Sequence, residues 1–386
     1  MIGTADPPKL HLRVAIIHDW MTVMGGAEQV VDRLLGLFSP TPDIYTFHAD
    51  RAKLPTRLSD AIKQESRLAS LPGLRETASS DGRWRWLLPF MPHFFESLDL
   101  RGYDLVISAS HACAAGVKPT PGTPHLVYCY TPMRYAWMPD MERSRFGALE
   151  ALGWRVVRRR LRAWDLRASA RPTAYVAISA AVAERIAAFY GRSAVVIHPP
   201  VAVDSFRGSG PHDATHFLWV NRFVAYKRPL EVVRAFAQLP NLRLTMVGVG
   251  PLRDEVLAYV AKHRLVNVDV PGWVDSEGLT ELYRHCGAFV HIGEEDFGIS
   301  MVEAQSAGLP VLAVNLGGAA DIVGEQTGLL LRAGFSVEDV SRAAASIAER
   351  TWDRDAISAS ATRFAAERFD QQLTDLVTTL VAPVPA

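Results

Sequence analysis

Cysteine is scarce in this sequence. The three cysteines, Cys113, Cys129 and Cys286, are scattered over 386 residues, with no CxxC pair and no cluster of histidines beside them. This spacing argues against a structural zinc site and is weak evidence for a reducing compartment.

Long apolar runs and an excess of one charge are also missing. No stretch reaches about 18 uninterrupted apolar residues, so we expect no membrane-spanning helix. The 41 basic residues balance the 41 acidic ones, so the overall charge gives no indication of nucleic-acid binding. The short apolar run near the N-terminus follows two prolines and does not resemble a signal peptide. We therefore expect a cytoplasmic protein.

The sequence does contain short β-branched runs that alternate with helical segments. In the first half the expected strands lie at 12–20, 104–111, 125–132, 174–179 and 194–200, and in the second at 216–223, 242–250, 266–273, 288–293 and 310–315. Helical patterns follow several of them, and the segment 337–381 is expected to be helical throughout. Such alternation predicts parallel sheets with right-handed crossovers, which is an α/β fold.

A segment rich in proline, glycine and serine divides the two sets of strands. We expect a linker at 198–212, between Rossmann-like domains at 1–197 and 213–365. The residues 366–386 are expected to form a C-terminal helix that crosses back to the first domain. Ligands of doubly wound folds bind at the carboxyl ends of the strands, so the sequence predicts two such domains facing a central cleft.

Two loops that follow strands carry residues suited to anions. The pair Gly25–Gly26 lets main-chain N–H groups approach an anion at a helix start, although such a pair is also typical of a simple turn. Arg222 and Lys227 lie on one loop near a helix start, where the helix dipole disfavours cations. A diphosphate ligand would explain both cations, and the alternative is a solvated basic loop.

Gly248 and Gly250 follow another strand and raise the possibility of a dinucleotide site. The fingerprint requires a third glycine, but Arg253 stands there, while Asp269 does lie about 20 residues further on, as the ribose-binding acid would. A nicotinamide-dependent oxidoreductase is therefore weakly supported. Trp273 also follows a strand, and it is expected either to stack on a nucleobase or to belong to the core.

The stretch EEDFGISMVEA, residues 294–304, places two carboxylates eight positions apart. Each carboxylate can accept two hydrogen bonds from a vicinal diol, so Glu295 is suited to sugar hydroxyls and Glu303 to those of a ribose. Phe297, Gly298 and Ile299 lie between them, where main-chain amides at a helix start can meet phosphate or sugar oxygens. Taken singly, each acid could be an ordinary surface residue.

This constellation resembles the retaining glycosyltransferases of family 4, which have the GT-B fold and the signature E-x-F-G-x-x-x-x-E. Further resemblances are the GGAE after the first strand, the SH of SASHA, the loop NRFVAYKRP, VGVGP and the GG of VNLGGAADIV. The resemblance implies that Arg222 and Lys227 neutralise the donor diphosphate, that Glu295 binds the donor sugar, and that His111 stands near the reacting centre. A capping or core histidine is the alternative for His111.

The resemblance also implies roles for the rest of the donor site and for each domain. The first domain would bind the acceptor and the second the nucleotide sugar. The proposed donor-binding residues are Gly25, Gly26, Gly248, Trp273, Phe297, Gly298, Ile299 and Glu303. No cofactor and no metal are expected. The stretch YCYTPMRYAWMPD resembles bacterial O-antigen mannosyltransferases, which favours GDP-mannose; a UDP-sugar and a non-catalytic nucleotide-sugar-binding protein are the alternatives.

Two segments of the first domain combine aromatic and basic residues. These are residues 82–95 and residues 154–171, the second with seven arginines. They predict peripheral association with an anionic membrane surface and a polyprenyl-diphosphate-linked saccharide acceptor. The alternative is a solvated basic helix whose aromatic side chains pack inward.

Overall fold

The computed structural model describes residues 9–70, 83–138, 148–207 and 212–382. Contacts divide the chain into two compact units, each described below by itself. The first contains residues 1–200 together with 369–386, and the second contains residues 201–368. No helix among the described residues is long and apolar enough to cross a membrane.

The first unit is built on a seven-stranded parallel sheet in the order β5-β4-β2-β6-β7-β8-β9. Its strands are β2 (Val14–His18), β4 (Asp43–Thr46), β5 (Ile62–Glu65), β6 (Leu105–Ser110), β7 (His125–Cys129), β8 (Ala174–Ala177) and β9 (Val195–Val196). A separate parallel pair joins β1 (Leu10–His11) to β3 (Phe38–Ser39). Every residue of β2, β6 and β7 is buried, as expected of parallel strands covered on both faces.

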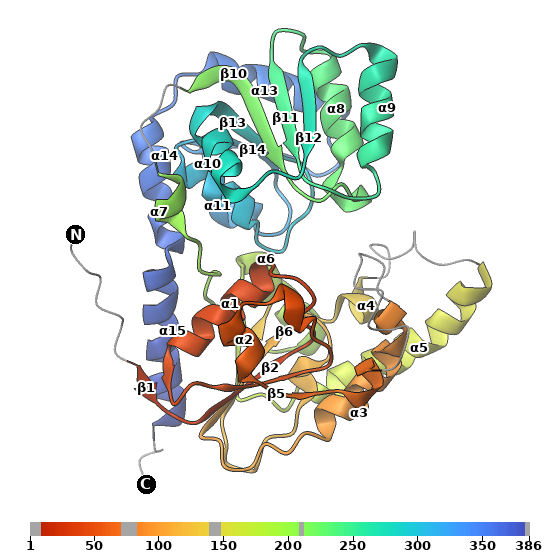
Figure 1. Cartoon of the computed structure of the whole chain (residues 1–386), viewed down its shortest axis with the longest axis vertical. Helices are drawn as coiled ribbons and strands as arrows, with labels where there is room; N and C mark the ends of the chain where they lie inside the picture. Colours follow the sequence, from red (N-terminus) through yellow and green to blue (C-terminus); the bar gives the residue numbers. More distant parts are fainter. Residues whose placement is uncertain (1–8, 71–82, 139–147, 208–211, 383–386) are drawn as a thin grey trace. The chain divides into compact units, whose positions relative to one another are not determined.

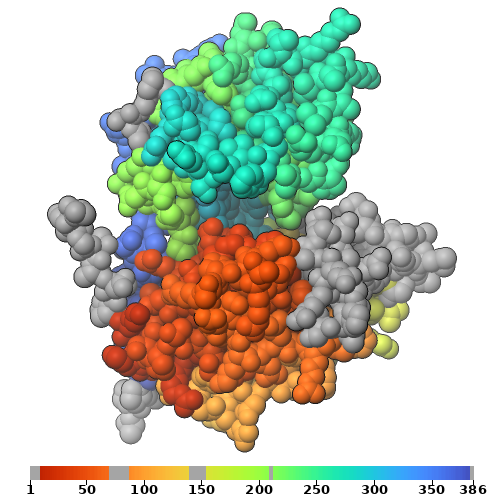
Figure 2. Space-filling model, viewed as in Figure 1, coloured from red at the N-terminus to blue at the C-terminus, as the bar shows by residue number. Residues whose placement is uncertain are grey.

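The helices of the first unit lie in the connections between these strands, except α15, which is the last element of the chain (Figure 1). They are α1 (Gly26–Gly36), α2 (Thr56–Ala61), α3 (Met91–Glu96), α4 (Arg134–Trp137), α5 (Ala148–Ala168), α6 (Ala180–Tyr190) and α15 (Ala366–Val381), with 3-10 turns η1 (Arg51–Lys53), η2 (Arg67–Ser70), η3 (Arg83–Phe90) and η4 (Ala114–Gly116). The caps predicted for α6 are confirmed: the Ser179 side chain accepts from Val182 N–H, and Gly191 ends the helix in the left-handed conformation. In the space-filling view the N-terminal part of the chain forms the red and orange surface of this unit (Figure 2).

The second unit has a six-stranded parallel sheet in the order β12-β11-β10-β13-β14-β15. Its strands are β10 (Asp213–Val220), β11 (Arg243–Val247), β12 (Val268–Gly272), β13 (Cys286–His291), β14 (Val311–Val314) and β15 (Gly328–Leu331). Its helices are α7 (Val203–Phe206), α8 (Pro229–Ala237), α9 (Arg253–His263), α10 (Ser276–His285), α11 (Ile299–Ser306), α12 (Ala319–Ile322), α13 (Val337–Glu349) and α14 (Arg354–Ala361), with turns η7 (Ala225–Lys227) and η8 (Thr362–Phe364). The two sheets confirm the predicted α/β class.

Some elements differ from the sequence prediction. The strands β4, β5 and β15 were not predicted; each is only four residues long, and β5 is an edge strand on which Lys63 and Gln64 are exposed. The segment 337–381 is not helical throughout. It breaks after Glu349, and the Asp353 side chain then caps α14 by accepting from Ala356 N–H.

The start of α15 packs on the first unit. Phe369 makes an edge contact with Tyr128 at a centroid distance of 5.8 Å. Arg33 of α1 donates two hydrogen bonds to Asp370, from Nε at 2.8 Å and Nη2 at 2.5 Å. Residues from 369 onward therefore belong structurally to the first unit, although they follow the second in sequence.

Candidate functional site

Each sheet has one place where the strand order reverses direction. In the first unit this switch point lies between β2 and β6, and in the second between β10 and β13. The connections that leave two such strands diverge to opposite faces, which opens a crevice beyond their carboxyl ends. The predicted residues His111, Arg222, Lys227 and Glu295 all lie on loops that leave three of these four strands, β6, β10 and β13.

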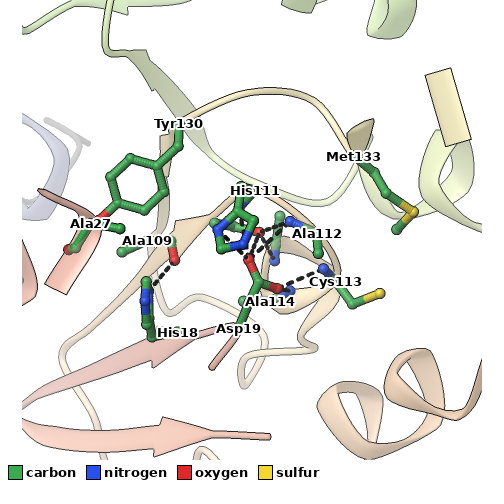
Figure 3. A network of polar contacts seen from close by, with 12 residues as sticks. His18, Asp19, Ala27, Ala109, His111, Ala112, Cys113, Ala114, Tyr130 and Met133 are labelled. Carbon is green, nitrogen blue, oxygen red and sulfur yellow. Dashed lines mark hydrogen bonds and ion pairs between the residues drawn. The ribbon is translucent and has the colours of Figure 1, made fainter. Parts of the chain in front are cut away.

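In the first unit the switch point is organised by a buried carboxylate, Asp19, which directly follows β2. One carboxylate oxygen accepts hydrogen bonds from the main-chain N–H groups of Cys113 and Ala114, both at 2.7 Å. The other accepts from His111 N–H at 2.7 Å, Ala112 N–H at 2.9 Å and Ser110 Oγ at 3.1 Å. Figure 3 shows this carboxylate directed into the loop after β6. Asp19 therefore fixes the loop that carries His111.

The His111 side chain is 26% exposed and stays at the surface of its unit. Its Nδ1 lies 3.5 Å from Asp19 Oδ2, and its ring packs edge-on against Trp20 at a centroid distance of 4.4 Å. The neighbouring His18 is fully buried, and its Nδ1 is 2.7 Å from the carbonyl of Ala109. His111 is thus the accessible histidine of the pair, which is inconsistent with a core role for it.

Gly25 and Gly26 lie at the start of α1 in the same unit. The Glu28 carboxylate accepts a hydrogen bond from Gly25 N–H at 3.1 Å. Burial raises the pKa of Glu28, against the opposing effects of His18 and of the main-chain bonds. One of the N–H groups expected to meet an anion is therefore occupied by a side chain of the helix itself.

In the second unit the predicted cations lie on the loop after β10. Lys227 is buried, with a side chain that is 5% exposed, and it forms an ion pair with Glu295 from the loop after β13. Arg222 is exposed and donates from Nη2 to Tyr226 Oη at 2.7 Å. A solvated loop does not describe Lys227, because a buried ammonium needs a partner charge.

Glu295 is held in place by its main chain. Its carbonyl accepts a hydrogen bond from Gly318 N–H at 2.8 Å. Gly317 has a φ of +61°, and a Cβ there would lie 1.8 Å from the Glu295 carbonyl oxygen. The glycine pair after β14 therefore allows the two loops to touch, which explains the GG of VNLGGAADIV in physical terms.

Glu303 lies in the second turn of α11, as predicted. Its Oε2 accepts a hydrogen bond from Tyr283 Oη at 3.0 Å. Burial raises the pKa of Glu303, and the Tyr283 bond opposes this rise. The structure thus separates the two acids: Glu295 pairs with a cation, whereas Glu303 meets a neutral phenol.

The residues between the two acids begin α11. Gly298 has a φ of +111° and precedes the first helical residue, Ile299. The Phe297 side chain is only 3% exposed and packs against Phe364 at a centroid distance of 5.5 Å. Phe297 is therefore a packing residue through its ring, and only its main chain could reach a ligand.

Trp273 and Gly248 lie on neighbouring loops after β12 and β11. The core alternative for Trp273 is wrong, because the side chain is 74% exposed. Gly248 N–H donates to the carbonyl of Gly272 at 2.7 Å, and a Cβ on Gly248 would lie 1.9 Å from the Asn221 carbonyl oxygen. The glycine thus serves close packing of three strand-end loops.

Two protein-family descriptions match the chain. Residues 24–205 match "Glycosyltransferase Family 4", and residues 203–364 match "Glycosyl transferases group 1". Each unit thus matches a glycosyltransferase family description over most of its length. The two matches together extend over residues 24–364.

Relatives and solved structures agree with this assignment. The chain is 33% identical over 165 residues to D-inositol 3-phosphate glycosyltransferase from Streptomyces avermitilis, covering 36% of this chain and 35% of that protein. It is 31% identical over 104 residues to O-antigen chain mannosyltransferase C from Escherichia coli, covering 26% and 28%. The fold is similar to that of Anabaena HepE, crystallised with UDP, with a TM-score of 0.70, 17% identity and coverage of 95% and 100%. The aligned part spans roughly a third of the first relative's length.

Sequence reasoning gave no role to several residues near the switch points, namely Asp19, Asn221, Tyr283 and His291. Asp19, Asn221 and His291 lie at the ends of strands β2, β10 and β13. For these three, the position at the end of a central strand is the signal that could have identified them, whereas Tyr283 lies in α10. Among the described residues no group of three or more His, Cys, Asp or Glu is arranged to hold a metal ion.

Proposed function

We propose that the protein is a retaining glycosyltransferase that moves a sugar from a nucleoside diphosphate sugar to a saccharide acceptor. The observation that carries this proposal is the buried Lys227 paired with Glu295 at the switch point of the second unit. A buried ammonium and a sugar-binding carboxylate at one strand end suit a ligand with both a diphosphate and hydroxyl groups.

Lys227 and Arg222 would act on the leaving group. The bond between the anomeric carbon and the diphosphate oxygen breaks, and a bond from the acceptor hydroxyl to the same carbon forms on the same face. Negative charge develops on the diphosphate during this step, and fixed cations stabilise it. The acceptor proton passes to the departing diphosphate, so no side-chain nucleophile and no metal are required by this proposal.

Glu295, Glu303 and His111 would contact the sugar parts of the substrates. Glu295 would accept hydrogen bonds from donor-sugar hydroxyls and Glu303 from the ribose. His111 would donate to the donor sugar or act locally in proton transfer. Trp273 is exposed beside Gly248 and would offer a flat surface to the nucleobase. Gly26, Gly298 and Ile299 would contribute main-chain N–H groups, whereas the N–H of Gly25 is occupied by Glu28 and this glycine would only allow close approach.

GDP-mannose is our proposed donor, and a lipid-linked saccharide of cell-surface polysaccharide synthesis is our proposed acceptor. Support comes from the stretch at 128–140 and from the partial match to an O-antigen chain mannosyltransferase. A UDP-sugar is favoured by a separate observation, the UDP in the structure of HepE.

A panel of GDP- and UDP-sugars tests the donor proposal. Each would be incubated with the protein, release of nucleoside diphosphate would be measured, and the anomer of the product would be read by NMR. Turnover of GDP-mannose with retained configuration supports the proposal. Turnover of UDP-sugars but not of GDP-mannose would favour the alternative donor. Binding of nucleotide sugars without any turnover would favour the non-catalytic protein.

We further propose that α5 docks the protein on the inner face of the plasma membrane. Five arginines of this helix, 155, 159, 160, 162 and 167, are exposed together with Val156 and Leu166, at 51% and 48% exposure. The buried face of α5 carries Leu161 and Asp165. Cations interleaved with exposed apolar side chains suit an anionic lipid surface. Of the other predicted segment, 82–95, residue 82 lies outside the described residues, while Phe90 is 57% exposed.

Co-sedimentation with vesicles of anionic lipid tests this docking. Replacing Arg155, Arg159 and Arg162 by glutamine is expected to weaken binding, since each basic residue near such a surface contributes about 1 kcal/mol. Glutamine at three exposed arginines of the second unit, 332, 342 and 350, serves as the matched control. Equal loss in both variants, or no binding of the native protein at low salt, would contradict a specific role for α5.

A further inference from the structure

A buried histidine lies behind the Lys227–Glu295 pair. His291 is the last residue of β13 and is 1% exposed. Its Nδ1 lies 3.2 Å from Asn221 Nδ2, at the end of the neighbouring strand β10. Its Nε2 has no hydrogen-bond partner among the described residues and lies 4.0 Å from Glu295 Oε1. A buried polar nitrogen left in this state is costly and calls for a physical reason.

The contact with Asn221 defines which nitrogen carries the proton. The amide nitrogen of Asn221 can only donate, so Nδ1 of His291 accepts, and in the neutral ring the proton is on Nε2. Burial and the nearby Lys227 charge lower the pKa of His291 well below its ordinary value, against the opposing effect of the Gly293 main chain. The ring is therefore neutral at physiological pH and presents one N–H group toward Glu295.

The present separation of 4.0 Å is too long for a hydrogen bond. In this structure the Glu295 carboxylate is engaged by Lys227 instead. A diphosphate would compete with Glu295 for the same ammonium, because both are anions that need the buried cation. Once Lys227 turns to the diphosphate, Glu295 loses its partner and lies beside the free Nε2–H.

We propose that His291 is a positioning residue that receives the Glu295 carboxylate when the donor diphosphate takes over Lys227. The Nε2–H group then donates to one carboxylate oxygen and leaves the other oriented toward the sugar hydroxyls. Asn221 holds the imidazole in the tautomer that this exchange requires. This inference rests on the proposed function, since it assigns the sugar to Glu295 and the diphosphate to Lys227.

Two substitutions separate this role from simple packing. In His291→Gln the amide nitrogen reaches about the position of Nε2 and can still donate to Glu295. In His291→Asn the shorter side chain places its amide near the position of Nδ1, so it keeps a polar contact with Asn221 but offers nothing at Nε2. If His291 has only a packing role, both variants should change the thermal stability, and their kcat values for transfer should be alike.

The experiment measures kcat for transfer, the dissociation constant of the nucleoside diphosphate, and thermal stability for both variants. We expect His291→Asn to lower kcat about tenfold to a hundredfold, as for loss of a hydrogen bond to a charged group. We expect His291→Gln to stay within about threefold of the native protein in kcat and in diphosphate affinity. We expect His291→Asn also to bind the diphosphate more weakly, because the hydrogen bond to Glu295 forms only when the diphosphate holds Lys227. Equal kcat values in the two variants, or equal diphosphate affinities, would overturn the proposal.

Glu295→Gln makes the two levels of inference distinguishable. If this variant transfers sugar normally, the role of Glu295 in the proposed function is wrong. If Glu295→Gln loses transfer while His291→Asn does not, only the positioning role of His291 is wrong. Glu295→Gln is also expected to bind the nucleoside diphosphate at least as tightly as the native protein, because Lys227 no longer has a competing anion.

Discussion

The two units place a carboxylate at the switch point of a parallel sheet, but they treat it differently. Asp19 in the first unit is fully buried and accepts from four main-chain N–H groups and one hydroxyl. Glu295 in the second unit has a side chain that is 28% exposed and meets one cation. The same location in one kind of sheet therefore holds a fully buried carboxylate in one unit and a partly exposed one in the other.

The difference indicates that the two carboxylates, Asp19 and Glu295, have different roles. Asp19 uses its hydrogen-bonding capacity inside the fold, so its role is to set the loop that presents His111. Glu295 is engaged by a single ammonium, which a stronger anion can remove, so its carboxylate remains available to a ligand. A buried network that is fully satisfied is rigid, whereas a partly satisfied one has alternatives.

The largest expected effect is on the stability of the first unit. Asp19→Asn keeps one acceptor oxygen but turns an amide toward two or more buried N–H groups, which then lack a partner. Each such group costs about 1–3 kcal/mol, so the free energy of unfolding should fall by roughly 3–5 kcal/mol. Chemical denaturation measures this loss, and a change below about 1 kcal/mol would show that the Asp19 hydrogen bonds do not hold the loop.

The second expected effect is on turnover rather than on folding. Lys227→Ala removes the buried cation that would stabilise the leaving diphosphate, and kcat should fall by about 100-fold to 1000-fold. Glu295, which is partly exposed, can be hydrated in this variant, so the protein should remain folded. Steady-state transfer assays with circular dichroism as the folding control measure both quantities. A variant that retains near-native transfer contradicts the assigned role.

The third effect compares two buried acids within the first unit. Among the described residues the Asp165 carboxylate accepts two hydrogen bonds, from Trp137 Nε1 and Tyr190 Oη, both at 2.7 Å. Burial raises the pKa of Asp165 to about 6, against the effect of these bonds. The folded state therefore binds a proton that the unfolded state has released, and the stability linked to this group is lost as the pH rises through about 6.

Asp165→Asn removes this proton linkage while keeping an oxygen acceptor. From about pH 4 to about pH 7 the native protein should lose roughly 1–3 kcal/mol of stability relative to the variant. Urea denaturation of both proteins at several pH values measures the difference. A difference that does not change with pH would mean that the pKa of Asp165 is the same in the folded and unfolded states.

The smallest effect concerns the second acid of the second unit. Tyr283→Phe removes the hydrogen bond to Glu303, with an expected loss of about 1 kcal/mol. Because this bond opposes the rise in the pKa of Glu303, the pKa should rise further in the variant. Nucleoside diphosphate binding should then weaken toward low pH sooner than in the native protein. If the pH dependence of binding is the same in the variant and the native protein, Glu303 does not contact the ribose.

Much of the architecture followed from the sequence because buried parallel strands are continuous β-branched runs. The strands β2, β6 and β7 were recognised for this reason, as were the caps of α6. The edge strand β5 was missed because its residues Lys63 and Gln64 are exposed and polar. Local pattern does not reveal strands that are defined by pairing alone.

Only those residues of the candidate site that belong to recognisable motifs were predicted. Glu295 and Lys227 were recognised individually. Their ion pair depends on the pairing of β10 with β13, and β13 begins 66 residues after β10 ends. Asp19 was given no role, since its partners are one hydroxyl and four main-chain N–H groups that lie 91 to 95 residues away. Any residue type other than proline can supply a main-chain N–H group, so the sequence does not show which residues donate to Asp19.

Calorimetric titration of GDP and UDP into native protein and Lys227→Ala tests the central claim most directly, with NAD as a control ligand. The account predicts that one nucleoside diphosphate binds the native protein, that the Lys227→Ala variant binds it at least tenfold more weakly, and that NAD does not bind. Equal affinity in the two proteins would contradict a diphosphate site at the switch point of the second unit.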